Sequence, residues 1–560
     1  MSKTIKINCL NIHQSRLFPL GVSLSSICEM LKEERHLDIE PIAAFVNHSP
    51  ENLDTELYHP ALVEFIDISH PEGMRVYTRS LTFLLGAAID ELWPGGQFRI
   101  EHSVSNGFFC RINLNKKVDD KDLQAIKQRV RTLAQADLPI EQIEEETSSV
   151  IDMFRQKGRE DLVKLFEHYD HLYTHYVRMG EHIDHFYGPL ASSSRYIRNF
   201  DLIAYPGSED GFLLRLPKAE DPDQLKEMVP QPKMFGIFKE FMQWNKLLGQ
   251  STVGDINACC FKGNVADMIK VSEALQEKRV SQIVDNILAQ PVRKRIILVS
   301  GPSSSGKTTF SKRLAVQLAV AGIKPLAISL DDYFLEREQT PRDEKGEYDY
   351  ESLYALDLEL FNTQLQELLA GKEVGLPRYN FNTGKKDYPE DKRIRLEDNQ
   401  VLILEGIHAL NPDLLPKIPQ EVLYKIYVSA LTSISLDNHN RIATTDNRLI
   451  RRLIRDAKYR GIPARDTLAR WKSVRQGEDK WIFPYQENAD VFFNSAMAFE
   501  LLVLKRYAVP SLRNVPQNCP EYAEAIRLLR FLDYIAIVPD NEIPPTSLLR
   551  EFVGGSSFNY

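Results

Sequence analysis

The sequence predicts an α/β protein whose C-terminal half is built on a parallel sheet with helices on both faces, preceded by two smaller α+β units. Three observations lead to this fold class. From residue 291 to about residue 510, short apolar runs typical of buried strands alternate with stretches of helical periodicity. The first run, residues 295–300, leads directly into a glycine-rich loop, and two later runs end in carboxylates. Near the start of the chain, residues 5–9 alternate apolar and polar side chains, as half-buried strands do.

Length and composition describe a globular chain of several domains. At 560 residues the chain is too long for one hydrophobic core, and its apolar (43%) and charged (26%) fractions are those of soluble proteins. A net charge of −9 gives no support to nucleic-acid binding by the whole chain. No apolar run approaches the roughly 20 residues that span a bilayer, and the six scattered cysteines fit a reducing compartment. We therefore expect a cytoplasmic protein without a membrane partner.

Residues 1–65 are predicted to form a small α+β unit. After the strand at 5–9, Ser23 is placed to cap a short helix, and residues 42–47 return to a strand. On Gly21-Val-Ser-Leu and Ala44-Phe-Val-Asn, this stretch resembles the TGS module, a ubiquitin-like β-grasp domain at the front of threonyl-tRNA synthetases.

The resemblance to those synthetases continues over residues 66–240. Val63-Glu-Phe-Ile-Asp and Phe186-Tyr-Gly-Pro-Leu look like their second N-terminal domain, which is related to tRNA-editing domains. The metal-type site of that family uses H-x-x-x-H and C-x-x-x-H. The matching positions here are Arg79, Phe83, Phe186 and Leu190, none of which can ligate a metal. We therefore expect a binding or scaffolding role and no editing hydrolysis.

Five histidines fall close together between residues 168 and 185. Two of them, His171 and His175, are four residues apart on a predicted helix, a spacing that can bring two imidazoles to one metal. Interleaved aromatic residues favour the other interpretation, a solvated helix face. The five are His168, His171, His175, His182 and His185.

Two helical segments flank the region that alternates strands and helices, residues 291–510. Residues 241–290 carry helical periodicity up to Pro291 and are predicted to be a helical connector. Residues 511–560 contain a helical stretch at 522–532 and form a C-terminal tail, for which the sequence suggests packing and no chemistry.

The glycine-rich loop, residues 301–309, fits the pattern G-x-x-x-x-G-K-[ST] between a strand and an amphipathic helix. Its glycines allow successive N–H groups and a helix N-terminus to point at one anion, while Lys307 adds charge and Thr308 can ligate Mg²⁺. The implied ligand is a nucleoside triphosphate; the alternative is a turn that binds nothing. The predicted nucleotide-binding residues in the loop are Gly301, Ser303, Ser304, Ser305, Gly306, Lys307, Thr308 and Thr309.

Carboxylates follow two further predicted strands, at Asp331 and Glu405. Ligands of such sheets bind beyond the carboxyl ends of the strands, and phosphoryl transfer needs charge neutralisation and an aligned acceptor oxygen. We predict that Thr308, Glu405 and Asp331 ligate Mg²⁺, and that Asp331 is the general base. The alternative is that Asp331 caps a helix or lies in an outer shell, with the adjacent Asp332 in its place.

Arginines recur at helical spacing in residues 446–456. Arg448, Arg451, Arg452 and Arg455 are predicted to share one helix face, which costs free energy unless an anion lies opposite. We interpret this helix as a lid over the transferring phosphoryl group. The alternative is an exposed basic face that pairs with surface carboxylates or touches RNA.

At this point residues 291–510 resemble the uridine kinase branch of the uridine kinase/phosphoribulokinase family. Five ordered segments carry the resemblance: Asp331-Asp332-Tyr333-Phe334, Tyr348-Asp349-Tyr350-Glu351, Pro377-Arg378-Tyr379-Asn380-Phe381, Leu404-Glu405-Gly406-Ile407 and the lid helix Asp446–Asp456. The resemblance implies a P-loop kinase in which Asp331 is the base, Asp349 holds ribose hydroxyls and Tyr379 lies at the nucleobase. With it, we assign Lys307 and Arg455 to catalysis, Arg455 and Arg460 to ATP, and Arg452 to the acceptor.

Three positions depart from the family pattern. Gly384 stands where pyrimidine-specific members place a histidine, Ile462 replaces a lid arginine, and Arg470 stands where a glutamine is expected. The phosphate and ribose machinery is retained, whereas the contacts that read the base are altered.

The sequence therefore predicts an ATP- and Mg²⁺-dependent nucleoside kinase that phosphorylates the 5′-hydroxyl, with uridine and cytidine as leading acceptors in pyrimidine salvage. One alternative keeps the chemistry and changes the acceptor to a purine nucleoside or another hydroxylated small molecule. Another is an RNA-binding, translation-linked regulator with a nucleotide switch, although no N-K-x-D motif follows the loop. A homo-oligomer is expected.

Overall fold

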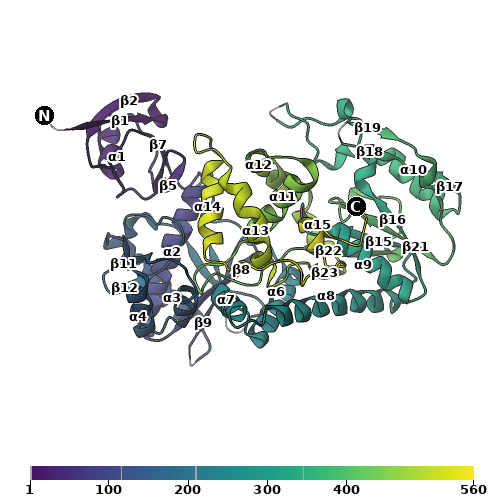
Figure 1. Cartoon of the computed structure of the whole chain (residues 1–560), viewed down its shortest axis with the longest axis horizontal. Helices are drawn as coiled ribbons and strands as arrows, with labels where there is room; N and C mark the ends of the chain where they lie inside the picture. Colours follow the sequence, from purple (N-terminus) through teal and green to yellow (C-terminus); the bar gives the residue numbers. More distant parts are fainter. Residues whose placement is uncertain (1–2, 115, 209–210, 345, 382, 560) are drawn as a thin grey trace.

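The computed structural model describes residues 3–114, 116–208, 211–344, 346–381 and 383–559. Figure 1 shows the N-terminal sheet at the upper left and the sheet of the C-terminal half at the right, with helices between them. Helix α8 (Val265–Leu288) runs along the lower edge toward the right-hand sheet. Within the described residues, no helix combines the length and the apolar character that crossing a membrane requires.

The N-terminal part is a five-stranded sheet with one helix packed on it. Its strand order is β2-β1-β7-β4-β5, and β1 buries Ile5, Ile7 and Cys9, which confirms the predicted alternation. The Ser23 side chain accepts a hydrogen bond from Ser26 N and so caps α1, also as predicted. The elements are β1 (Thr4–Cys9), β2 (Gln14–Pro19), β3 (Val22–Ser23), α1 (Leu24–Glu33), β4 (Ala43–Val46), β5 (Ser49–Glu51), β6 (Glu56–Leu57) and β7 (Ala61–Ile66).

The middle part is organised around α2 (Pro71–Leu92). Every residue of this helix from Ser80 to Ile89 is buried, and most of them are apolar. Two antiparallel sheets surround it, in the orders β13-β14-β9-β8 and β10-β11-β12. The remaining elements are β8 (Gln97–Val104), β9 (Gly107–Asn113), α3 (Asp120–Gln135), β10 (Glu141–Glu146), α4 (Thr147–Gln156), α5 (Glu160–Phe166), β11 (Tyr173–Met179), β12 (His182–Asp184), β13 (Asp201–Ala204) and β14 (Gly211–Arg215).

The predicted histidine helix is wrong. His175 lies in β11, which pairs with β10, and His171 precedes that strand. Val177 and Met179 are both buried and lie two positions apart. Side chains two positions apart share one face of a strand but not one face of a helix, so the segment pairs as a strand. Across the described residues, His, Cys, Asp and Glu side chains do not gather in groups of three or more that could hold a metal ion.

Three helices lie between the middle part and the C-terminal half. They are α6 (Pro232–Leu248), α7 (Val253–Phe261) and α8, so the predicted helical segment is helical, although α6 begins before residue 241. Phe235, Phe238 and Phe241 of α6 are buried against both neighbouring parts.

The C-terminal half contains a parallel sheet of five strands in the order β16-β21-β15-β22-β23. All five strands match apolar runs from which the sequence predicts strands. The elements are β15 (Ile296–Ser300), α9 (Lys307–Val320), β16 (Lys324–Ser329), α10 (Leu358–Leu369), β17 (Glu373–Gly375), β18 (Arg378–Asn380), β19 (Lys385–Asp387), β20 (Arg393–Arg395), β21 (Gln400–Glu405), β22 (Leu423–Ser429), α11 (Thr444–Arg460), α12 (Ala464–Trp481), β23 (Val491–Asn494) and α13 (Glu500–Arg513).

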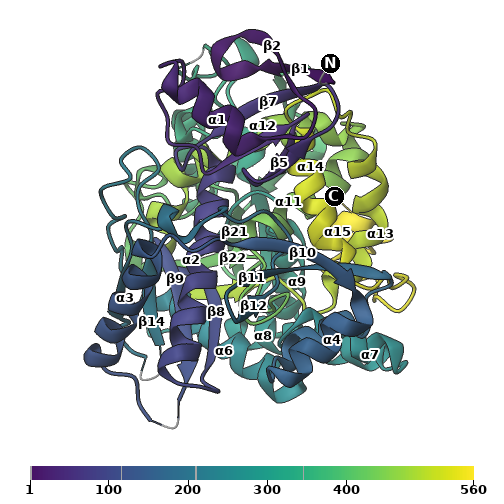
Figure 2. The same ribbon diagram turned by 90° about the vertical axis from the view of Figure 1, so that its left-hand side faces the viewer.

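The chain ends in two further helices that return to earlier elements. Helix α14 (Tyr522–Asp533) lies between β5 and the lid helix α11 (Figures 1 and 2), and Arg530 donates to Pro50 O and Ser49 Oγ. Helix α15 (Arg550–Val553) lies beside α9 and α11. The predicted helical stretch is confirmed, and the tail packs against the C-terminal half rather than extending from it.

Candidate active site

The glycine-rich loop of residues 301–309, from here on called the phosphate loop, follows β15. At two of its positions the backbone has a conformation or a neighbour that only glycine permits. A Cβ on Gly301 would lie 1.9 Å from the carbonyl oxygen of Val428, and Gly306 has φ of 83° at the N-cap of α9. The Lys307 side chain is buried and its Nζ donates to the carbonyl of Pro302 at 3.2 Å. The loop therefore has the conformation in which N–H groups of the first turn of α9 point outward toward an anion.

Two carboxylates face the start of α9, as the sequence predicts. Thr308 Oγ1 donates to Glu405 Oε2 at 3.5 Å. Burial raises the pKa of Glu405 to about 7; Lys307 opposes this shift, and the Asp331 carboxylate adds to it. One hydroxyl and two crowded carboxylates form a hard-oxygen set that suits Mg²⁺, because a cation would relieve their mutual repulsion.

Asp331 and Asp332 have different surroundings. The side chain of Asp332 accepts from Lys392 Nζ at 2.5 Å and from Tyr379 N at 3.3 Å, so it is engaged away from the loop. Desolvation raises the pKa of Asp331, against Lys307 and the lid arginines. The N-cap alternative for Asp331 is wrong, because Ser329 caps this turn and accepts from Asp331 N.

The predicted acceptor side consists of Asp349 and an aromatic wall, which is formed by Phe334, Tyr379 and Phe381. Asp349 is half-buried and accepts from Glu351 N at 3.1 Å. The Tyr379 ring centroid lies 5.6 Å from that of Phe334 and 5.0 Å from that of Phe381. Within the described residues, no group bonds the Tyr379 hydroxyl. The wall is thus apolar, with one buried polar atom left for a ligand.

Arg337 occupies the space beside Gly384. A Cβ on Gly384 would lie 2.7 Å from Arg337 Cβ and 2.9 Å from its Nε, while Arg337 Nη2 donates to the Phe381 carbonyl at 2.7 Å. The arginine therefore lies at the edge of the aromatic wall, next to the position where the family pattern has a histidine.

The arginines of the lid helix α11 have two kinds of surroundings. The prediction that all four share one face opposite an anion is therefore wrong for two of them. Arg448 and Arg451 are fully buried in ion pairs with Glu478 and Glu500. These two are structural, because their charges are matched inside the core.

Arg452 contacts the phosphate loop, and the buried Arg448 also does so, since its Nε donates to the carbonyl of Ser303 at 2.9 Å. Arg452 Nη1 donates to Ser303 Oγ at 2.9 Å, and Arg460 Nη1 donates to Asp456 at 3.1 Å. Burial lowers the pKa of Arg455 to about 10, and the nearby Arg460 acts in the same direction. Like charges gathered without full compensation fit an anion that binds between them.

Sequence reasoning missed three carboxylates at this site. Glu478 accepts from Ser303 N at 3.1 Å, and Glu551 of the C-terminal tail accepts from Thr309. Burial raises the pKa of Glu351 to about 7, with Arg452 acting in the opposite direction. Glu351 ends the segment Tyr348–Glu351 that carries part of the family resemblance. Nothing in the local sequence connects Glu478 or Glu551 with a loop more than 170 residues away.

Comparison with known proteins identifies the C-terminal half. Residues 296–500 match the family described as the Phosphoribulokinase / Uridine kinase family. The uridine kinase of Ligilactobacillus salivarius is 31% identical over 215 residues, which are 38% of this chain and 91% of that protein. The chain belongs to the phosphoribulokinase/uridine kinase family. It is a phosphotransferase with an alcohol group as acceptor.

Two further family members are similar to the same region. The uridine kinase of Ureaplasma parvum serovar 3 is 27% identical over 35% of this chain and 86% of its own length. The uridine kinase of Staphylococcus aureus is 29% identical over 38% of this chain and 94% of its own length. The family match begins at residue 296, so the synthetase resemblance of residues 1–240 stays a prediction.

Proposed function

We propose that the chain transfers the γ-phosphoryl group of ATP to the 5′-hydroxyl of a nucleoside, with uridine and cytidine as the leading acceptors. The observation that carries this proposal is the position of Asp331. It shares one electrostatic environment with Lys307, Arg455 and Arg460, while the adjacent Asp332 is bonded elsewhere. A carboxylate beside cationic phosphate ligands is the arrangement that phosphoryl transfer to a hydroxyl requires.

Each side chain of the site has a proposed role in the reaction. The amides of the phosphate loop and Lys307 hold the triphosphate, and Arg455 and Arg460 lie over the transferring group. Thr308, Glu405 and Asp331 would hold Mg²⁺, which supplies charge neutralisation on the phosphates. Asp331 accepts the proton of the attacking hydroxyl as its oxygen bonds to the γ-phosphorus, and the bond between that phosphorus and the bridging oxygen breaks to release ADP.

The acceptor is proposed to lie between Asp349 and the aromatic wall. The Asp349 carboxylate can accept hydrogen bonds from two vicinal hydroxyls, and a flat base can stack on Tyr379 or Phe381. Arg452, which already bonds the phosphate loop at Ser303, would close over the 5′ end of the acceptor.

A different acceptor is the second candidate, favoured by Arg337. Because its guanidinium donates and cannot accept, it selects groups that carry carbonyl or anionic oxygens at this edge of the wall. A purine with a carbonyl, or another hydroxylated small molecule with an anionic group, would satisfy it. RNA binding by the front half, a homo-oligomer and a cytoplasmic location remain predictions.

The decisive experiment is an acceptor screen with ATP and Mg²⁺ across pyrimidine nucleosides, purine nucleosides and sugar phosphates. We expect turnover with uridine or cytidine, and a loss of most of that turnover in Asp331→Asn. Turnover confined to purine nucleosides or sugar phosphates would replace the first candidate by the second. If no acceptor is phosphorylated although ATP binds, the nucleoside kinase proposal is wrong.

A further inference from the structure

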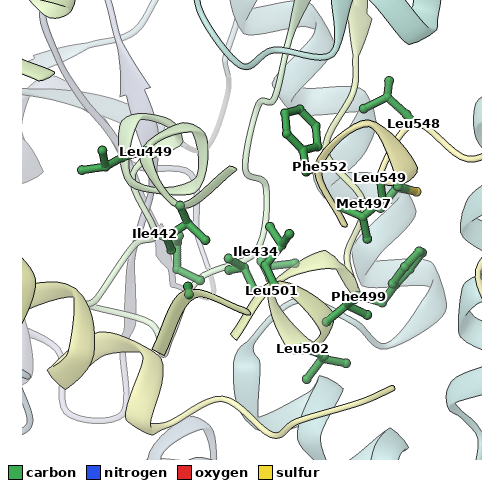
Figure 3. Close-up of a cluster of buried hydrophobic side chains, with 14 of the residues drawn as sticks. Ile434, Ile442, Leu449, Met497, Phe499, Leu501, Leu502, Leu548, Leu549 and Phe552 are labelled. Atoms are coloured by element: carbon green, nitrogen blue, oxygen red, sulfur yellow. The ribbon is translucent and has the colours of Figure 1, made fainter. Parts of the chain in front are cut away.

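The C-terminal tail is docked beside the phosphate loop by buried apolar side chains. Leu548, Leu549 and Phe552 are each 0% exposed. Figure 3 shows them in one cluster with Met497 and Phe499, which follow the last strand of the parallel sheet. Full burial removes the apolar surface of these side chains from water, so the three of them hold the segment in place.

Two side chains of the tail contact the nucleotide-binding residues themselves. Leu548 approaches the phosphate loop so closely that a Cβ on Gly306 would lie 2.4 Å from Leu548 Cδ2. The Glu551 carboxylate accepts hydrogen bonds from Thr309 N at 3.2 Å and from Thr309 Oγ1 at 2.6 Å. Thr309 N belongs to the first turn of α9, where the unpaired N–H groups of the helix attract anions.

The tail also bonds the lid helix and the next turn of α9. Lys458 Nζ of α11 donates to the carbonyl of Val553 at 2.5 Å, and the Arg451 guanidinium lies 5.0 Å from the Phe552 ring centroid. Lys312, one turn after Thr309, donates to the carbonyl of Asn559. Residues 548–559 therefore contact the phosphate loop, the first two turns of α9 and the lid helix.

A carboxylate and a phosphate cannot both bind the Thr309 amide. The two groups are anions that need the same donor, and their charges repel each other at contact distance. Glu551 is also one of the carboxylates that raise the pKa of Glu405, so it lies near the predicted metal ligands as well. Nucleotide binding at this turn requires that Glu551 leave.

We propose that residues 548–559 are an autoinhibitory segment, in which Glu551 holds the place of a phosphate group of ATP on α9 until the nucleotide displaces it. This inference rests on the proposed function, because it requires ATP at the phosphate loop. The apparent affinity for ATP is then the affinity of the released form multiplied by the fraction of molecules in which the segment is released.

The test measures binding of ATP with Mg²⁺ to the full chain by calorimetry. The variants are Glu551→Gln, which keeps the shape and removes the charge, and Glu542→Gln, which alters an exposed carboxylate nearby. We expect Glu551→Gln to bind ATP about tenfold or more tightly than wild type, since a hydrogen bond to a charged group is weakened in the competing segment. The Glu542→Gln control is expected to bind as wild type does.

Hydrogen exchange supplies a second measurement that needs no variant. Addition of ATP and Mg²⁺ to the wild-type chain is expected to increase deuterium uptake in residues 548–559 as the segment is released. Equal or weaker ATP binding by Glu551→Gln, or unchanged or reduced uptake in this segment, would overturn the inference while leaving nucleotide binding intact. If neither folded protein binds ATP, the inference and the proposed function both fail.

Discussion

Arg527 donates two hydrogen bonds of 2.8 Å to the carboxylate oxygens of Asp446, and so joins α14 to the first turn of the lid helix α11. Beyond this pair, ion pairs continue into the middle part of the chain. The series runs Asp446, Arg527, Glu524, Arg75, Glu72 and Arg79, with successive separations of 2.8, 2.6, 3.0, 2.8 and 2.5 Å. Arg79 stands at a metal-ligand position of the synthetase pattern. In this chain its guanidinium pairs with Glu72 and ends the series of ion pairs.

Arg527→Met is expected to destabilise the protein strongly. Removal of one partner of a buried ion pair costs about 3–5 kcal/mol, because Asp446 would be left without its counter-charge and Glu524 would keep only Arg75. The matched control is Arg530→Met one turn later, whose half-exposed side chain bonds Ser49 and Pro50 at 3.3–3.4 Å. Thermal unfolding of both variants is the measurement, and an equal loss of stability would contradict the role assigned to the series.

Asp331→Asn is expected to lower turnover by about 10²- to 10⁴-fold while the Kd for ATP changes little, because the variant loses the proton acceptor and keeps the phosphate ligands. Asp332→Asn provides the matched control. Its carboxylate bonds Lys392 and the Tyr379 amide, so we expect it to retain most turnover. Steady-state kinetics distinguish the two; similar turnover in both variants would show that Asp331 is not the base.

Two lid arginines are expected to respond differently to the same substitution. Arg455→Gln should leave the thermal unfolding temperature nearly unchanged and lower kcat, since Arg455 is proposed to face the transferring phosphoryl group. Arg448→Gln should instead lower the unfolding temperature, because Glu478 would lose a buried partner. Should Arg455→Gln unfold as readily as Arg448→Gln, both arginines would be structural.

Arg337→Ala is expected to change the acceptor and not the donor. The substitution removes the guanidinium at the edge of the aromatic wall, so the KM for the acceptor should rise by about tenfold while the KM for ATP stays the same. Kinetics with each acceptor found in the screen provide the measurement. A rise in the KM for ATP alone would place Arg337 outside the acceptor site.

His102 is expected to make the protein less stable in mild acid. Burial lowers the pKa of His102 from 6.5 to about 3, and its ring stacks on Phe238 at a centroid distance of 3.9 Å. Between these two pH values the unfolded chain binds a proton that the folded chain excludes, so stability falls as the pH is lowered below 6.5.

Protonation of His102 in the unfolded chain lowers the free energy of unfolding by about 2 kcal/mol between pH 7 and pH 5. His102→Phe removes the titratable imidazole and keeps an aromatic ring. The unfolding temperature of this variant should therefore fall less between pH 7 and pH 5 than that of wild type. An identical fall in the two proteins would mean that His102 is protonated in the folded state.

Local patterns predicted the fold of the C-terminal half well, because each strand of the parallel sheet is a short apolar run and the phosphate loop has its own spacing. The same patterns misjudged the lid helix. Helical spacing places Arg448 and Arg455 on one face, but only the tertiary structure brings Glu478 to Arg448. Partners distant in sequence decide which arginines are neutralised and which stay available to an anion.

The histidine segment and the C-terminal tail escaped prediction for related reasons. His171 and His175 have helical spacing, yet pairing with β10 decided the local structure in favour of a strand. Glu551 lies in a short helix at the end of the chain, and no spacing rule connects it with Thr309, which is 242 residues earlier. Contacts of this kind depend on the whole assembled core.

One hydrophobic cluster contains side chains from α4 and α5 as well as from α9, α11, α13 and α15. Its members extend from Val150 to Val553, far outside the part that matches the kinase family. A gene fission at either end of that part would leave apolar faces in water on both products. Descendants of this chain are therefore expected to inherit the front half, the kinase and the tail together as one unit.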